Sequence, residues 1–422
     1  MDLKMFLMRV VFALIIFIFS LYFYPVVFDT WGYMYSVSLG PISTFKAIIS
    51  TCLLIIIIAL TNFKKILFRH VCDTLIIGIF LPIATMVLLI NSSLEYSYIP
   101  FSSVLLIAIV IFLLGGSTNM RLMAFRFKHG IPFDYFVKAG FLMYLFTIGW
   151  LIFEYGLSSI TRNMFDTFLN TYEIRSENRT SGLLGYLLGW TILVFFPLLI
   201  TLALEKKQIL YWIIGFFGSF IVFQILAVKV IFLNYVLLTG FCFGYSYFRP
   251  AYKSYLPYIA FIFVFIIGIV GADIGTAILD RFYYLVGLNS IFYFEYFSNH
   301  QPMYFSGTKL DMGFGGYNIR PGFVIDNAYY GGSGTNSSAG YLPSIFADTR
   351  WIGVIFVSLF LGLIFVIIEK IAGHSQLFAY IVAIALAYAL INHPFMMLFL
   401  SNGLIFILFI AFFVRSRVKI KK

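Results

Sequence analysis

Long apolar runs separated by short polar loops make up most of this chain. A membrane-crossing helix needs about 20 consecutive, mostly apolar residues, and about twelve runs of this kind recur along the sequence. Their approximate limits are 6–28, 40–60, 72–90, 99–115, 137–153, 183–204, 209–227, 230–247, 255–277, 351–368, 377–393 and 398–414. The pattern predicts an all-α integral membrane protein with about twelve transmembrane helices.

The positions of lysine and arginine predict how these helices are oriented. Loops rich in both residues stay on the cytoplasmic side of a membrane. With the N-terminus inside, most basic residues fall in the loops after every second span and in the C-terminal tail, whereas the short loops 29–39 and 91–98 have none. We therefore expect both termini in the cytoplasm and the two longer loops, 154–182 and 278–349, on the opposite side. The larger of these joins spans nine and ten.

Composition agrees with a membrane protein and excludes a soluble one. The 422 residues are 62% hydrophobic and 11% charged, with a mean hydropathy of +0.99. The net charge of +11 does not indicate nucleic-acid binding, because the basic residues lie mainly in loops between apolar runs. The run 6–28 is longer than a signal-peptide core and is kept as a span. No repeat or linker divides the chain, so residues 1–422 are predicted to form a single membrane domain.

Several kinds of chemistry have no support in the sequence. The three cysteines, Cys52, Cys72 and Cys242, are far apart and predict no disulfide framework. No phosphate-binding loop or dinucleotide fingerprint is present. The five histidines are too scattered for a zinc site. We therefore expect no metal and no cofactor.

The interval 278–349 is the longest polar stretch, and we expect the chemistry there and in loop 154–182. Its aromatic content argues against disorder, and Phe282–Phe297 is expected to form an interfacial or re-entrant helix. A guanidinium matches a phosphate with two parallel hydrogen bonds. Candidate anion-binding residues are the arginines of both loops: Arg175, Arg179, Arg281, Arg320 and Arg350.

At an outer membrane surface, the expected anion is a lipid diphosphate. If a sugar chain leaves from that diphosphate, the arginines stabilise the developing charge, and a base must deprotonate the attacking hydroxyl. The candidates for this base, among which the sequence does not choose, are His300, Asp311, Asp326, Glu177 and Asp348.

Each candidate also has a plainer interpretation. Arg281 and Arg350 stand at the mouths of spans, where arginines extend to lipid headgroups. Arg175 and Arg179 alternate with glutamates and can form surface ion pairs. A lone histidine such as His300 is more often structural than catalytic.

The whole chain resembles the bacterial O-antigen polymerases, the Wzy family, in its number of spans and its two large loops. The similarity is strongest over Asn327–Tyr330 and from Asn336 to Gly353, where a polar Ser/Gly/Pro stretch precedes an acidic residue and a glycine that opens the next helix. Some members carry, in each large loop, an arginine followed after ten residues by a glycine. Arg320 and Gly331 have this spacing, but the first loop has no such pair.

The resemblance implies a metal-independent, inverting glycosyltransferase of the bacterial inner membrane. Its substrate would be an undecaprenyl-diphosphate-linked oligosaccharide, polymerised on the periplasmic face with release of undecaprenyl diphosphate. It implies Arg320 and Gly331 as substrate-binding residues, and a chain-length regulator and a repeat-unit flippase as partners.

Two alternatives stay open at this point. An O-antigen ligase has a similar topology and an outer loop with arginine and histidine, which His300 would satisfy. A flippase is a transporter and is expected to have short loops and charges inside its spans. The polar residues of this chain concentrate outside the apolar runs, which favours surface chemistry over transport.

Overall fold

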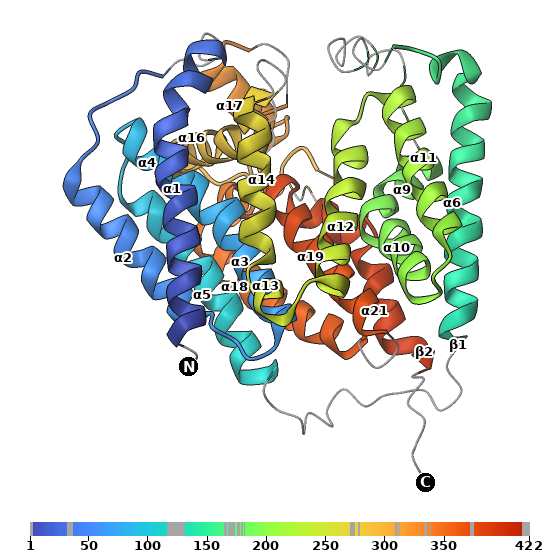
Figure 1. Ribbon diagram of the computed structural model, residues 1–422. Coiled ribbons are helices and arrows are strands. Elements are labelled where there is room, and N and C mark those ends of the chain that lie inside the picture. Colours follow the sequence, from blue (N-terminus) through green and yellow to red (C-terminus); the bar gives the residue numbers. More distant parts are fainter. Residues whose placement is uncertain are drawn as a thin grey trace. The chain divides into compact units, whose positions relative to one another are not determined.

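The computed structural model describes residues 3–31, 37–115, 131–163, 167, 174, 178, 180, 182–270, 275–276, 279–308, 311, 313–332, 336–337, 339–371 and 375–415. Helices form nearly all of the regular structure in these ranges (Figure 1). The exception is a parallel pairing of two-residue strands, β1 (Ile131–Pro132) and β2 (Val414–Arg415). The predicted all-α class is confirmed.

Two compact units divide the chain. Unit 1 comprises Met1–Thr118, Arg249–Phe365 and Ala387–Phe395, and unit 2 comprises Asn119–Phe248, Val366–Leu386 and Met396–Lys422. Two long helices contribute residues to both units: α18 (Tyr341–Ile371) and α19 (Gln376–Asn392).

Unit 1 contains the N-terminal helices and the predicted polar interval. Its other elements are α1 (Leu3–Trp31), α2 (Thr44–Leu60), α3 (Ile66–Leu75), the π-helix η2 (Ile76–Phe80), α4 (Leu81–Leu89), α5 (Glu95–Gly115), α13 (Pro250–Lys253), α14 (Leu256–Val270), the π-helix η6 (Asp280–Tyr284), α16 (Leu285–Asn299) and α17 (Pro321–Tyr329).

Unit 2 is built from the middle of the chain and its C-terminal end. Its further elements are α6 (Phe133–Tyr155), the 3-10 helix η4 (Leu157–Ser159), α9 (Gly182–Trp190), the π-helix η5 (Thr191–Phe195), α10 (Phe196–Glu205), α11 (Ile209–Leu226), α12 (Lys229–Tyr247), most of α20 (Phe395–Leu400) and α21 (Leu404–Phe413).

Seven helices in the described residues are long and apolar enough to cross a membrane. They are Leu3–Asp29, Ile66–Leu89, Glu95–Gly115, Phe133–Tyr155, Gly182–Glu205, Ile209–Leu226 and Tyr341–Lys370. Four shorter apolar helices, Thr44–Leu60, Ile231–Tyr247, Leu256–Gly268 and Gln376–Asn392, match other predicted spans. The last predicted span is interrupted by a turn between α20 and α21, where Gly403 has a φ of 91°. The number of twelve crossings and the orientation stay predictions.

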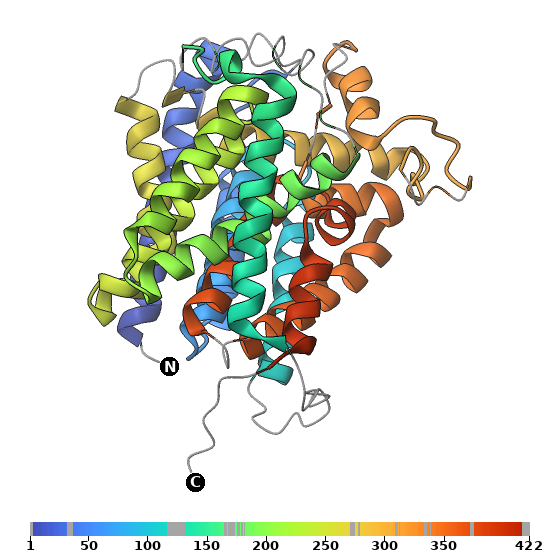
Figure 2. The same cartoon turned by 90° about the vertical axis from the view of Figure 1, so that its right-hand side faces the viewer.

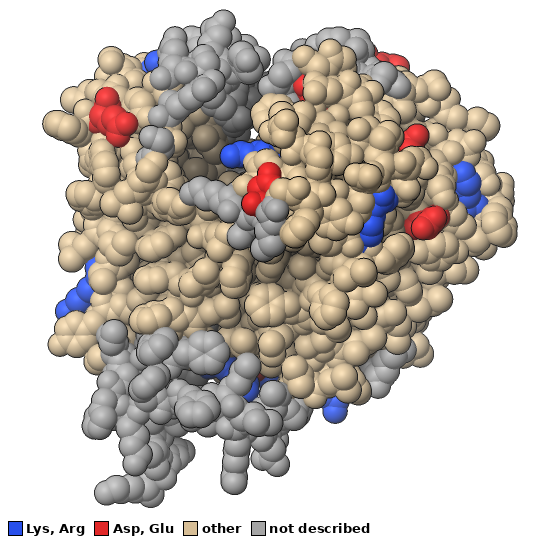
Figure 3. Space-filling model, turned by 180° about the vertical axis from the view of Figure 1, so that it is seen from behind, with Lys and Arg blue, Asp and Glu red and all other residues tan. Residues whose placement is uncertain are grey.

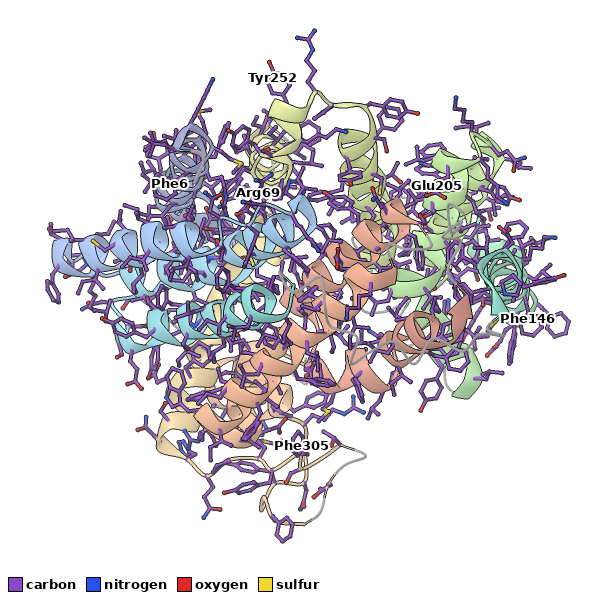
Figure 4. The ribbon with its side chains drawn as sticks, turned by 90° about the horizontal axis from the view of Figure 1, so that it is seen from below. Phe6, Arg69, Phe146, Glu205, Tyr252 and Phe305 are labelled. Atoms are coloured by element: carbon purple, nitrogen blue, oxygen red, sulfur yellow. The ribbon has the colours of Figure 1, made fainter. Side chains whose placement is uncertain are left out.

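The outer faces of the long helices carry large apolar side chains, as lipid contact requires. Phe112, Phe153 and Phe356 are 72%, 89% and 70% exposed. Phe146 lies on the face of α6 that points away from the other helices of its unit (Figure 4). Charged residues are sparse and scattered over the face drawn in Figure 3. These features describe a multi-pass membrane protein.

Two of the membrane-suited helices contain a π-helical turn just before a proline. Proline has no N–H to donate and crowds the carbonyl four residues earlier, and a wider turn accommodates this defect. Pro82 follows η2 in this way, and Pro197 follows η5. The helical path nevertheless continues from Ile66 to Leu89. The single apolar run 72–90 therefore corresponds to three elements, α3, η2 and α4.

The polar interval folds onto the end of unit 1 opposite the N-terminus, where α16 and α17 lie near the last turns of α1 (Figure 1). The loop between α16 and α17, described at residues 301–308, 311 and 313–320, extends beyond these helices (orange, Figure 2). Helix α16 packs closely on α4, since a Cβ added at Gly287 would lie 2.4 Å from the carbonyl oxygen of Pro82. Glycine at this position therefore sets the depth at which α16 is seated.

Candidate functional site

Helix α16 presents a stripe of polar and aromatic groups to the rest of the polar interval. Asn289, Tyr293, Tyr296 and His300 follow one another at intervals of four, three and four residues, so they share one face of the helix. Helix α17 packs on α16, and the ring of Tyr329 stacks on Phe292 with centroids 4.2 Å apart. The expected interfacial helix is therefore the element on which the site residues are assembled.

His300 and Arg350, both predicted site residues, lie together at the end of α16. The His300 ring is exposed and stacks on Tyr296 at 3.9 Å between centroids. Its Nδ1 lies 2.8 Å from the carbonyl oxygen of Tyr296. Because a carbonyl only accepts, Nδ1 donates there and Nε2 is the acceptor nitrogen. The Arg350 guanidinium donates to the carbonyl oxygen of His300 and lies 5.7 Å from the Phe346 ring centroid.

Arg350 also breaks helix α18. Its φ of 57° and ψ of −147° are non-helical, in a region that side chains other than glycine rarely occupy. The break frees carbonyls of the preceding turn, and loop backbone groups bind them. The N–H of Met303 donates to Ala347 O at 2.9 Å, and that of Tyr304 donates to Asp348 O at 3.1 Å. The loop that follows α16 is thus attached to α18 at the break that Arg350 makes in that helix.

Asp348, a candidate base, has a structural place in this attachment. Asp348 is 8% exposed, and its carboxylate accepts the N–H of Phe305 at 3.2 Å. Tyr304 and Phe305 have φ values of 49° and 64°, so the loop also holds two non-glycine residues in the left-handed region. Backbone strain is therefore present on both sides of this contact, at Tyr304 and Phe305 in the loop and at Arg350 in α18.

A second group of predicted residues gathers where α17 ends. Asp326 is fully buried, and the hydroxyl of half-buried Tyr330 donates to Asn289 Oδ1 at 2.6 Å. Burial raises the pKa of the Tyr330 phenol well above its usual range; the charges of Asp280 and Asp326 raise it further, and that of Arg281 lowers it. Arg281 is exposed. These charges therefore lie close to one phenol, which stays neutral and able to donate.

The predicted pair Arg320 and Gly331 brackets helix α17. Arg320 is the exposed N-cap residue, and Gly331, with a φ of 72°, follows the C-cap residue Tyr330. At 1.5 Å of rise per helical residue, the two residues are about 15 Å apart. The ten-residue spacing is therefore the length of one short helix, and the two ends do not converge on one phosphate group.

Asp311 organises a turn in the exposed loop. Its carboxylate accepts the N–H groups of Gly313 at 2.8 Å and Gly307 at 3.1 Å. These two hydrogen bonds, the one from Gly313 first, hold the pKa of Asp311 below its usual range. An acid held in its charged form by backbone donors is a poor match for a base that must take up a proton.

Three predicted residues of the first loop, Glu177, Arg175 and Arg179, lie outside the described residues. Within the described part of the chain, no group of three or more His, Cys, Asp or Glu side chains is arranged to hold a metal ion.

The sequence analysis missed a buried ionic network at the other end of unit 1. Arg9 of α1 forms an ion pair with Asp73 of α3, and both side chains are 0% exposed. Arg9 Nε donates to Asp73 Oδ1 at 3.1 Å, and the Tyr258 hydroxyl donates to the same oxygen at 2.9 Å. Arg9 also donates to Thr61 Oγ1 at 3.1 Å. We call Arg9, Thr61, Asp73 and Tyr258 the Arg9 network. Asp73 inside an apolar run was the signal for it.

Comparisons of the chain with protein-family models, with curated proteins and with solved structures found no match.

Proposed function

We propose that this chain is an inner-membrane glycosyltransferase that polymerises oligosaccharide units linked to undecaprenyl diphosphate, on the side of the membrane away from the cytoplasm. One observation carries the proposal. The polar interval contains an exposed histidine with an acceptor nitrogen, His300, at the end of α16, and an exposed arginine, Arg320, at the start of α17, which packs on α16. A base and anion-binding groups are what transfer from a lipid diphosphate requires.

His300 is the favoured base among the described candidates. Asp326 is fully buried, Asp348 is bound to the loop backbone, and Asp311 is held charged by a turn. His300 is exposed and keeps Nε2 as an acceptor. In the proposed step, a sugar hydroxyl gives its proton to Nε2 while its oxygen attacks the anomeric carbon of the donor.

An arginine completes the step on the donor side. As the new C–O bond forms, the bond from the anomeric carbon to the diphosphate breaks, and the electron pair leaves with the diphosphate. Attack from the side opposite the leaving group inverts the anomeric carbon. Exposed Arg320 would offer guanidinium donors to the diphosphate charge. Arg281 precedes His300 by 19 residues on one continuous helical path through η6 and α16, about 28 Å at 1.5 Å per residue, so it is too far from the histidine to share this step. Arg350 is engaged with the His300 carbonyl, so its role in this arrangement is to hold the loop.

A ligase and a flippase are the alternatives. A ligase would use the same donor and the same histidine, and would differ in its acceptor. The Arg9 network is the specific observation that favours a transporter, because ionisable groups inside membrane helices often line transport paths. The pairing of Arg9 with Asp73 offers a structural explanation for the same residues.

Deletion of the gene in its host, followed by a gel of the lipopolysaccharide, tests the proposal. A polymerase predicts collapse of the ladder to core plus one repeat unit. Loss of every repeat unit would indicate a ligase or a flippase, and an unchanged ladder would place the protein outside this pathway.

Complementation of the deletion strain then tests the residues. We expect no ladder from His300→Ala. Arg320→Ala should shorten it and Arg320→Lys should restore part of it if charge dominates, whereas failure of both would favour paired guanidinium hydrogen bonds. Asn318→Ala, an exposed change in the same loop, is the control and should leave the ladder intact. Full polymerisation by His300→Ala would remove the histidine from the mechanism.

A further inference from the structure

Arg69 of α3 connects three segments that are far apart in the sequence, at the end of unit 1 that carries the N-terminus. The residue is 5% exposed. Its Nη1 donates to the Met5 sulfur of α1 at 2.6 Å and to the carbonyl oxygen of Phe63, between α2 and α3, at 3.4 Å. Its Nη2 donates to the hydroxyl of Ser254, which directly follows α13, at 3.1 Å. One guanidinium therefore links α1, the α2–α3 connection and the α13–α14 connection.

Each of these three contacts has a lysine as its neighbour in the sequence. The lysines are Lys4, Lys64 and Lys253. The first two are exposed and the third is half-buried. Because neighbouring Cα atoms are about 3.8 Å apart, the lysines approach Arg69 from three different segments. Figure 4 shows Arg69 beside α1 and α14. We call Arg69 and these three lysines the Arg69 cluster.

The charge around the cluster is strongly positive. Residues 3–12, 61–75 and 249–258, which contain the cluster, carry seven basic residues and one acidic residue. The basic residues are Lys4, Arg9, Lys64, Lys65, Arg69, Arg249 and Lys253, and the acidic one is Asp73. Asp73 is already buried in its ion pair with Arg9. These three segments therefore have an excess of positive charge, which complements an anion.

Arg69 and the lysines have different parts in such a site. The thioether, carbonyl and hydroxyl that accept from Arg69 are neutral groups, so these contacts leave the net charge of the guanidinium in place. Lysines are compact charges on flexible stems, and three of them from separate segments can approach one phosphate from several sides. Arg69 fixes the distances between the segments, and the lysines supply the contacts.

The position of the cluster selects a lipid as the source of the anion. Lys4 and Lys64 stand at or just before the starts of two helices that are long and apolar enough to cross a membrane. The ends of such helices lie at the level of the lipid headgroups. Leu3 and Leu7 of α1, beside Lys4, are 61% and 51% exposed and suit contact with acyl chains. Basic sites between membrane helices bind the headgroups of acidic lipids.

We propose that the Arg69 cluster binds the phosphate of an acidic phospholipid, with Lys4, Lys64 and Lys253 in contact with the headgroup. This inference is independent of the proposed function, because the polar interval lies at the opposite end of unit 1 (Figure 1). The bound lipid links α1, α3 and α13 from outside, in addition to the contacts that Arg69 makes between them.

Titration with single lipids tests this site. The full chain is purified in detergent and titrated with phosphatidylglycerol or with zwitterionic phosphatidylcholine, and native mass spectrometry gives the dissociation constant of the first bound lipid. We expect the wild type to prefer phosphatidylglycerol. Each lysine near an acidic headgroup contributes about 5-fold in affinity, so Lys64→Gln combined with Lys253→Gln should weaken binding of phosphatidylglycerol about 25-fold. Lys4→Gln alone should weaken it about 5-fold.

Lys206→Gln combined with Lys207→Gln is the matched control. These two exposed lysines directly follow α10 in unit 2, so this double variant removes the same amount of charge elsewhere. It should bind phosphatidylglycerol as the wild type does. Without added lipid, all variants should unfold close to the wild-type temperature, because exposed substitutions change stability little. With phosphatidylglycerol, the unfolding temperature of the wild type should rise more than that of the cluster variants.

The outcomes distinguish a built site from general surface charge. An equal loss of affinity in the two double variants would overturn the proposal, because the lysines would then act only through the surface potential. Unchanged affinity in all cluster variants, or a wild type without preference for phosphatidylglycerol, would also overturn it. Excess inorganic phosphate is the last arm of the experiment. The lipid should stay bound, and its displacement would assign the cluster to a soluble phosphate instead.

Discussion

Unit 1 contains two buried polar regions that differ in how their charges are balanced. In the Arg9 network, one cation meets one carboxylate, and each guanidinium nitrogen has an acceptor, although Asp73 Oδ2 has no hydrogen-bond partner in the described residues. Around Tyr330, the charges of Asp280, Asp326 and Arg281 all act on one phenol, which donates to Asn289 Oδ1. Burial alone does not mark a functional site. The Arg9 network links helices through one ion pair, whereas the charges around Tyr330 act on a phenol that stays neutral.

The largest effect is expected from Asp73→Asn. The change leaves the Arg9 cation buried without its counter-charge, which costs about 3–5 kcal/mol. The double variant Arg9→Met, Asp73→Leu should be much less destabilised, because it removes both charges together. Unfolding of the purified proteins in detergent measures both. If the double variant lost as much free energy of unfolding as Arg9→Met and Asp73→Leu lose in sum when each is made alone, the pair would not be a structural link.

The next effect concerns the break in α18. Arg350→Ala keeps the strained backbone and removes the guanidinium, whereas Arg350→Gly removes both the guanidinium and the strain of about 1–3 kcal/mol. We expect the glycine variant to be the more stable of the two. In both, the amides of Met303 and Tyr304 should exchange faster with solvent, measured by hydrogen exchange. Unchanged exchange in both variants would mean that Arg350 does not hold the loop.

Asp280→Asn should have a smaller effect on stability than the same substitution at Asp73. It removes a negative charge from a region where the charge of Asp326 acts on the same phenol. We expect the free energy of unfolding to change by less than about 1 kcal/mol. A loss as large as that of Asp73→Asn would erase the distinction between the two regions.

The smallest effect concerns pH and the Asp311 turn. Because the folded turn lowers the pKa of Asp311, it is stabilised above the ordinary pKa of aspartate, about 3.9, and loses this contribution as the pH falls through the folded value. Amide exchange at Gly307 and Gly313, corrected for the intrinsic effect of pH, should therefore quicken in acid. In Asp311→Asn this acid-dependent change should disappear.

The apolar pattern predicted helices well and their interruptions poorly. The run 99–115 corresponds to Glu95–Gly115, and 209–227 to Ile209–Leu226. Helix α18 begins at Tyr341, ten residues before the predicted span, because its first turns are polar and end at a non-helical Arg350. A backbone angle of this kind has no signature in hydropathy.

The sequence predicted where along the chain the candidate site lies, but only partly which of its residues contact one another. His300 and Arg350 are 50 residues apart, and their contact depends on how the loop attaches to α18. Arg320 and Gly331 were paired by spacing, yet that spacing is a helix that separates them.

The Arg9 network also has a consequence for the order in which the chain is made. Asp73 follows Arg9 by 64 residues, and Tyr258 follows Asp73 by 185 residues. At about 5–20 residues per second, Arg9 is synthesised about 3–13 s before its counter-charge, Asp73. During that interval Arg9 has to remain at the headgroup level, where its charge is solvated. The N-terminal helix therefore reaches its final depth only after the third helix has been synthesised.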